Sequence, residues 1–120
     1  MNRARAIAET ARLAAEGERL EAAPTLGRLR LWLQLSDDLL STIWGTMDRY
    51  HLAWLLVGRP AAPRGRPMTP DEEAAYVRDV AGQKTAVLRM SLRALEAQGI
   101  PFVGETESAG TMATGDEAEP

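Results

Sequence analysis

"TLGRLRLWLQLSDDLLSTIWGTMDRYHLAWLLV", residues 25–57, carries the strongest periodic pattern in the chain. Ten positions follow one another in alternating steps of three and four residues, and nine of them are apolar: Leu26, Leu29, Leu33, Ser36, Leu40, Ile43, Met47, Tyr50, Trp54 and Val57. This spacing is typical of a helix that packs one seam against other helices. It predicts a helix over 25–57, in which Thr25 is the N-cap and Gly45 marks a kink, a break into two helices or a close helix crossing.

More apolar side chains lie off this seam than a single neighbouring helix could cover. They are Leu31, Trp32, Leu35, Leu39, Trp44, Leu52, Leu55 and Leu56. A helix that is apolar on more than one side is either central in its fold or in contact with a second subunit. Tryptophan is also enriched where interfaces concentrate their binding energy, so we expect a protein partner. The candidate interface residues are Leu33, Leu40, Ile43, Trp44, Met47, Tyr50 and Trp54.

A second strong helix is predicted over 69–98. The segment "TPDE" places Thr69 at the N-cap, Pro70 at the first helical position and Glu72 at the third, which is the arrangement of a capping box. Apolar residues then recur at helical spacing, and Gly99, with a proline two residues later, ends the helix.

These two helices and a thinner one over 2–22 predict an all-α fold. Residues 2–22 are rich in Ala, Arg, Glu and Leu, and Pro24 ends their helix. We expect a long antiparallel hairpin of 25–57 and 69–98 with the N-terminal helix laid alongside, which is a three-helix bundle within residues 1–103. Its remaining apolar surface is covered either within the chain or by oligomerisation.

The end of the chain differs from the rest in composition. Residues 104–120 hold five acids, no base and no aromatic residue, so they are predicted to form a disordered acidic tail. Just before it, the apolar side chains of Ile100, Phe102 and Val103 are expected to dock against the end of the bundle.

Composition excludes several classes of protein. The chain has no cysteine, which rules out a disulfide framework, a thiolate zinc site and a cysteine nucleophile. Its first residues lack the apolar core of a secretory signal, and its most apolar window is short and carries charges. We therefore expect a cytoplasmic protein that has no membrane contact and no cofactor.

The connector between the two strong helices, 58–68, is basic. Its first ten residues, "GRPAAPRGRP", hold three arginines and no acid, although the whole chain has a net charge of −3. One interpretation is a linker that only keeps two helices apart, in a chain that uses arginine for nearly all of its cations.

The other interpretation concerns "PRGRP", residues 63–67, which resembles the core of the AT-hook, a short DNA-binding motif. In that motif an extended Arg-Gly-Arg enters the narrow minor groove of A·T-rich DNA, where the negative potential is strongest. The resemblance implies that Arg64 and Arg66 enter the groove and that Gly65 lies on its floor. Arg59 belongs to a partial second copy of the motif.

Three groups could carry chemistry, and none of them makes a convincing site. Asp48 and His51 stand one helical turn apart, as metal ligands in bundles do, but the chain has no second histidine, and we expect a polar helix face with His51 half exposed. Asp37 and Asp38 are adjacent and diverge by about 100° on a helix. Ser36, the one small polar residue of the seam, has no base near it in sequence.

The sequence therefore predicts a protein that is not an enzyme. The leading hypothesis is a helical protein–protein interaction or assembly module that is homo-oligomeric through the helix over 25–57. The alternative is a small DNA-associated regulator or accessory factor that uses the arm at 63–67.

Overall fold

The computed structural model describes residues 1–58 and 65–105, and it confirms the predicted all-α fold. Within these residues there is no strand. The helices are α1 (Arg3–Ala22), α2 (Leu26–Trp44), α3 (Arg49–Leu56) and α4 (Pro70–Glu96), followed by one helical turn at 103–105. None of these helices is both long enough and apolar enough to cross a bilayer.

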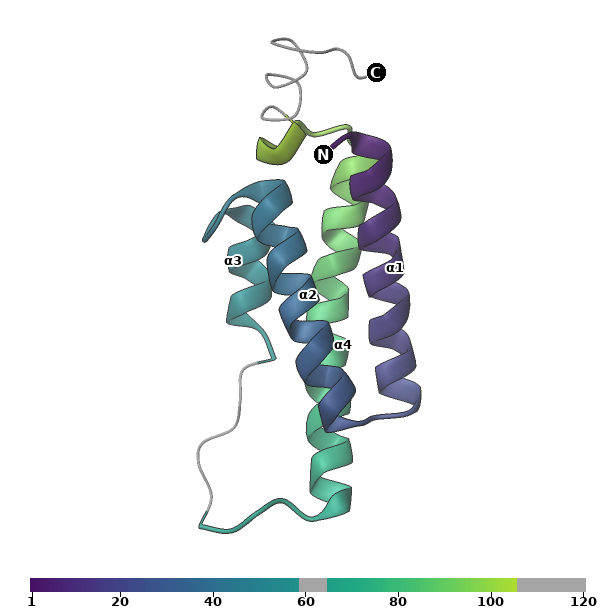
Figure 1. The fold of residues 1–120 in the computed structure, drawn as a ribbon, viewed down its shortest axis with the longest axis vertical. Helices are drawn as coiled ribbons and strands as arrows, with labels where there is room; N and C mark the ends of the chain where they lie inside the picture. Colours follow the sequence, from purple (N-terminus) through teal and green to yellow (C-terminus); the bar gives the residue numbers. More distant parts are fainter. Residues whose placement is uncertain (59–64, 106–120) are drawn as a thin grey trace.

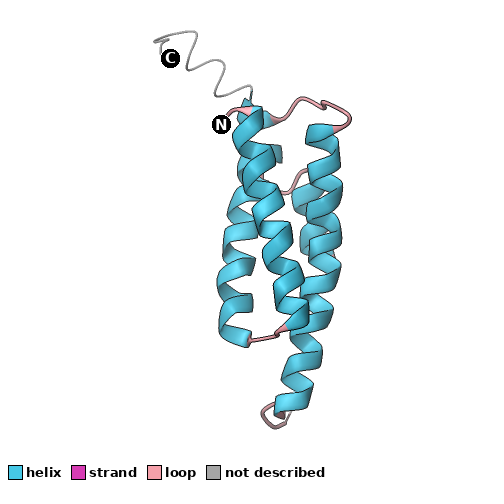
Figure 2. Ribbon diagram, turned by 90° about the vertical axis from the view of Figure 1, so that its right-hand side faces the viewer, coloured by secondary structure: helices cyan, strands magenta, loops and turns pink. Residues whose placement is uncertain are grey.

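Consecutive helices run antiparallel, so that α1 and α3 descend in Figure 1 while α2 and α4 rise. The contact between α1 and α4 is the most extensive, α2 packs on α1 and α3, and α3 packs on α4. Figure 2 shows the long helices lying along one common axis. The result is an up-and-down bundle of four helices, one of them short, in place of the predicted bundle of three. The predicted antiparallel hairpin of 25–57 and 69–98 holds only for α3 and α4, because α2 runs in the same direction as α4.

The predicted single helix over 25–57 is two helices, and the break falls at Gly45. Gly45 has a φ of +99°, which L side chains rarely adopt, and its N–H still donates to the Ser41 carbonyl at the end of α2. The chain then reverses, and Asp48 caps α3 by accepting a hydrogen bond from the Arg49 N–H. The apolar pattern continues across the break because α3 folds back onto the same core, so periodicity alone could not reveal it.

The start of α4 forms as predicted. The Thr69 hydroxyl accepts a hydrogen bond from the Glu72 N–H, and the Glu72 carboxylate accepts one from the Thr69 N–H. Pro70 at the first helical position has no N–H, so the capping box and the proline together leave fewer unpaired N–H groups at the helix start. At 27 residues, α4 is about 40 Å long and is the longest element of the bundle.

Three helices meet at Gly17 of α1. A Cβ at this position would overlap the Thr85 hydroxyl of α4 and lie 2.8 Å from the Trp32 ring of α2. The missing side chain lets the Trp32 indole N–H reach the Leu13 carbonyl of α1, to which it donates at 2.8 Å. Gly17 is thus a packing site, although glycine in a helix interior usually costs stability.

A second tryptophan anchors α2 to α4. The buried Trp44 indole N–H donates to the Ser91 hydroxyl at 2.8 Å, and the ring packs against Tyr50 and Phe102. Each indole therefore buries a large apolar surface and keeps its polar group satisfied.

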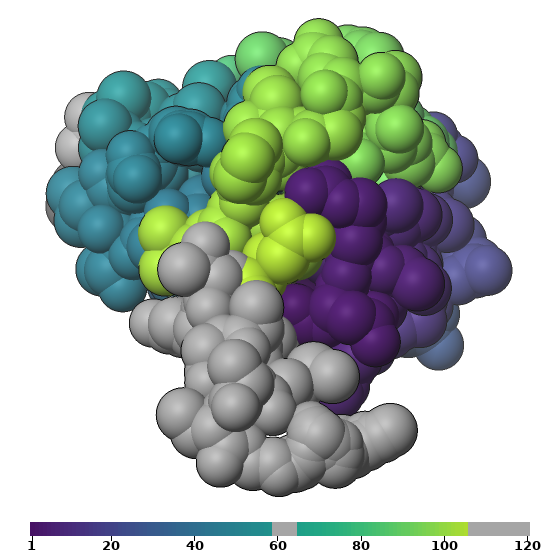
Figure 3. All heavy atoms as spheres, turned by 90° about the horizontal axis from the view of Figure 1, so that it is seen from above, coloured from purple at the N-terminus to yellow at the C-terminus, as the bar shows by residue number. Residues whose placement is uncertain are grey.

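The C-terminal end of the described chain closes one end of the bundle, as Figure 3 shows from above. Phe102 is buried, and the Arg3 guanidinium lies over its ring while donating to the Leu95 and Ile100 carbonyls and pairing with Glu105. The predicted docking of this segment is confirmed at Phe102 and at Ile100, which packs partly buried against the core, whereas Val103 is 43% exposed. The tail was predicted to begin at residue 104, but Gly104 and Glu105 are packed, and residues 106–120 lie outside the described part.

We predict that Gly17→Ala destabilises the protein although alanine is the better helix former. Alanine gains about 1 kcal/mol in propensity, but overpacking against Thr85 and Trp32 costs about 1–3 kcal/mol. Chemical denaturation should therefore show a lower free energy of unfolding. The control is Gly27→Ala, whose added methyl meets no atom within 4 Å and should stabilise by up to about 1 kcal/mol. A Gly17→Ala variant as stable as Gly27→Ala would contradict the packing argument.

Candidate interaction surface

The residues predicted to form an interface lie mostly inside the chain's own core. Leu40, Ile43, Trp44 and Trp54 are buried there. Leu33 and Tyr50 are partly buried and pack against the same core, and only Met47 is largely exposed. These side chains hold the bundle together, so all of them except Met47 have little surface left for contact with another molecule.

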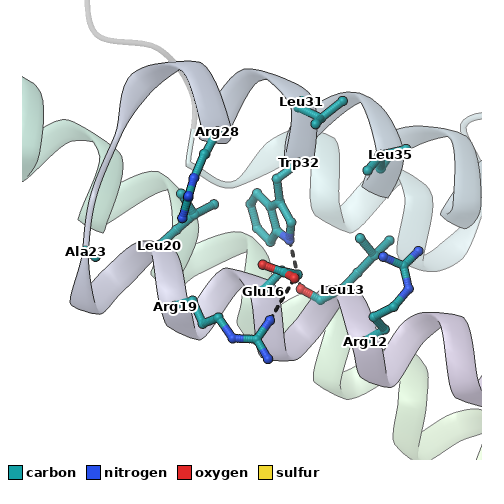
Figure 4. A pocket seen from close by; sticks show the side chains of 10 residues that line it. All are labelled: Arg12, Leu13, Glu16, Arg19, Leu20, Ala23, Arg28, Leu31, Trp32 and Leu35. Atoms are coloured by element: carbon teal, nitrogen blue, oxygen red, sulfur yellow. Dashed lines mark hydrogen bonds and ion pairs between the residues drawn. The ribbon is translucent and has the colours of Figure 1, made fainter.

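The apolar residues that the fold leaves exposed on α2 are Leu31 and Leu35. Leu31 is 59% exposed and Leu35 40% exposed, one helical turn apart. Both line a cleft of about 480 Å³ between α1 and α2, and Figure 4 shows them on the outer side of α2 while Trp32 points toward α1. Because neighbouring helical residues diverge by about 100°, the burial of Trp32 is what turns Leu31 outward.

Charged side chains surround these leucines. Arg12, Glu16 and Arg19 of α1 and Arg28 of α2 line the same cleft. Arg19 pairs with Glu16 at 2.7 Å, and Arg12 pairs with Glu9 one turn earlier on α1. We call this surface the α1/α2 face; it consists of Glu9, Arg12, Glu16 and Arg19 of α1 and of Arg28, Leu31, Leu35 and Asp38 of α2.

Sequence reasoning placed Leu31 and Leu35 off the main seam but did not select them as interface residues. The available signal was their position: they lie beside the seam at a spacing of four residues, so one covering helix would bury both or neither. What the sequence could not supply is which off-seam side the other helices cover.

The basic arm is described only in part. Arg59 and Arg64 lie outside the described residues, and Gly65 is exposed with no atom within 4 Å of where its Cβ would be. The Arg66 guanidinium makes two hydrogen bonds to the Glu72 carboxylate, at 2.8 and 2.9 Å, and this pairing raises the pKa of Arg66. Arg66 would have to leave this carboxylate in order to enter a DNA groove, and the DNA-binding hypothesis stays a prediction.

His51 is buried, contrary to the expectation of a half-exposed position. Its Nδ1 accepts a hydrogen bond from the Met47 N–H at 2.8 Å, so the ring proton lies on Nε2, which donates to the Asp37 carboxylate at 2.6 Å. Met47 has a φ of +65°, a strained conformation for a side chain with a Cβ, and this hydrogen bond holds it. His51 therefore fixes the turn between α2 and α3.

Lys84 of α4 stabilises the other end of α3, where the helix stops. Its ammonium group donates to the Trp54 carbonyl and lies 3.9 Å from the centre of the Trp54 ring. A cation beside the last carbonyls of a helix is favourable, and α3 has no basic residue of its own there. Lys84 is only 6% exposed, and this burial lowers its pKa from 10.5 to about 8.

The groups considered for catalysis or metal binding do not converge. Asp48 caps α3 while His51 turns toward Asp37, and among the described residues no three His, Cys, Asp or Glu side chains lie close enough to hold a metal. The Ser36 hydroxyl is fully buried, out of reach of a substrate. Asp37 accepts from His51 while Asp38 is exposed, so the two carboxylates do not act on one atom, as the helical geometry predicts.

Comparison with known proteins adds no assignment to this geometry: no family model matches the chain, and no curated protein or solved structure is significantly similar to it.

We predict that the lowered pKa of Lys84 gives stability a distinct dependence on pH. Between pH 8 and 10.5 the unfolded chain keeps the Lys84 proton while the folded chain releases it, so the free energy of unfolding rises with pH in that window. Denaturation across this range should show the free energy of unfolding of wild type rising by on the order of 2 kcal/mol relative to that of Lys84→Met. Arg78→Met, which removes an exposed cation from the same helix, should run parallel to wild type. Parallel profiles for wild type and Lys84→Met would contradict the assignment.

Proposed function

We propose that this chain is a non-enzymatic assembly module whose copies associate through the α1/α2 face. The observation that carries the proposal is the exposure of Leu31 and Leu35, side by side on α2 over an apolar cleft. Removal of such a leucine pair from water by a neighbouring surface favours association by about 25 cal/mol per Å² of buried apolar area.

The cleft has the composition of a protein-binding surface. Its floor is formed by Leu13, Leu20 and the Trp32 ring, and its rim is charged. An apolar centre with a polar rim is the usual anatomy of such interfaces. The rim arginines have long side chains that can cover apolar surface and also pair with carboxylates of a partner.

The helix that carries the face is anchored to two neighbouring helices. Trp32 ties α2 to α1, and Trp44 ties it to α4, so the backbone that presents Leu31 and Leu35 is held from both sides. A preformed surface loses less conformational entropy on association than a flexible one does.

We predict that Leu31→Glu prevents self-association while Leu56→Glu does not. The two leucines make a matched pair because each is 59% exposed, but Leu56 lies on α3 and does not line the cleft. The measurement is light-scattering mass after size exclusion over a range of concentrations. Wild type and Leu56→Glu should exceed the 13.1 kDa of one chain, and Leu31→Glu should approach it.

Thermal unfolding of both variants serves as a check on folding, because exposed substitutions usually change stability by only about 0.5 kcal/mol. A wild-type mass of one chain at every concentration, or an equal loss of mass in Leu56→Glu, would overturn the proposed function.

A further inference from the structure

Four exposed residues that form one stripe of α2 are spaced symmetrically about position 33. Arg28, Leu31, Leu35 and Asp38 follow one another in steps of three, four and three residues, and all four are exposed. Leu31 and Leu35 lie two residues before and after position 33. When two such helices pack antiparallel with position 33 at the centre, Leu31 of each copy faces Leu35 of the other.

The charges on this stripe follow the same symmetry. Arg28 and Asp38 lie five residues before and after position 33, and they carry opposite charges. Within residues 1–58 and 65–105 neither side chain has an ion-pair partner. Antiparallel pairing would set Arg28 opposite Asp38 of the second copy, and would do so twice. Parallel pairing would instead set Arg28 opposite Arg28.

The charged row of α1, in which Arg12 and Arg19 are exposed and Glu9 and Glu16 half-buried, has a second, independent self-complementarity. Glu9, Arg12, Glu16 and Arg19 are symmetric about position 14, so antiparallel pairing matches Arg12 with Glu16 of the other copy and Glu9 with Arg19. Within one chain these residues already form ion pairs along α1, and these pairs hold the side chains of the row in a defined conformation.

One twofold axis serves both helices. Position 14 lies eight residues before the end of α1, and position 33 lies seven residues after the start of α2. At 1.5 Å per residue, both are about 11 Å from the short link between these antiparallel helices. The hydrogen bond from Trp32 to the Leu13 carbonyl holds the two levels together.

We propose that the α1/α2 face binds the same face of a second copy, antiparallel and about a twofold axis through positions 14 and 33. This inference rests on the proposed function and names the surface that each copy recognises. Because the face binds the same face of a second copy, both faces are buried in the complex and association stops at a dimer. The leucines supply most of the affinity, and the Arg28–Asp38 pairs select the register and exclude a parallel arrangement.

The test is charge reversal with rescue, read as the dimer dissociation constant from sedimentation or light scattering. Arg28→Glu places two carboxylates opposite each other, and Asp38→Arg places two guanidinium groups opposite each other. Each variant alone should therefore weaken the dimer about tenfold or more.

Rescue follows when the two changes meet across the twofold axis. Combining both in one chain should restore the dimer, because the introduced carboxylate of one copy then faces the introduced guanidinium of the other. Mixing the two single variants should restore it as well, because each reversed charge then meets an opposite one. Arg30→Glu makes the same change in charge off the stripe and should leave the dissociation constant unchanged.

The possible failures are distinguishable. A wild type that stays a single chain overturns the proposed function and this inference with it. A dimer that Leu31→Glu dissociates, but that ignores Arg28→Glu and Asp38→Arg or is not restored by combining them, overturns the antiparallel register alone.

Discussion

The hydrogen bond from the Trp32 indole to the Leu13 carbonyl determines how α2 sits in the bundle. It requires Gly17, because a side chain there would occupy the space of the ring. Once the indole is packed against α1, the rotation of α2 about its axis is fixed, and Leu31 and Leu35 have to face outward. The core and the exposed surface are therefore consequences of the same contact. The burial of Trp32 against α1 also leaves Leu31 and Leu35 exposed to solvent.

The short helix α3 is stabilised by polar groups from its neighbours. An isolated helix of eight residues is far below the length at which helices are stable in water. His51 and Asp37 fix its beginning, and Lys84 satisfies its carbonyl end. Burying the Lys84 ammonium is unfavourable, as its lowered pKa shows, yet it supplies a donor where α3 has none of its own. The buried polar side chains of His51 and Lys84 thus have a structural explanation.

The sequence allowed much of the fold to be predicted but little of the surface. The capping box of Thr69 and Glu72 is local, so the start of α4 could be read directly. The reversal at Gly45 could not, because Met47, Tyr50 and Trp54 fit a continuing helix and a returning one equally well. The signals for the break were Gly45 itself and Asp48, a good N-cap residue. The interface prediction selected the most regular apolar positions, and all of these except Met47 belong to the core or pack against it. The exposed pair depends on the order of helices around α2, which is a tertiary property.

The contact between the two ends of the described chain has a topological consequence. The Met1 backbone nitrogen lies 3.4 Å from the Gly104 carbonyl, and Arg3 binds the segment that follows α4. A short peptide could join these ends, and the chain could be opened instead between Gly58 and Gly65. Such a circular permutant would begin with α4 and still contain α1 and α2 joined as they are now. The bundle is thus defined by which helices contact one another, and the order of the helices along the chain could be changed without altering the α1/α2 face.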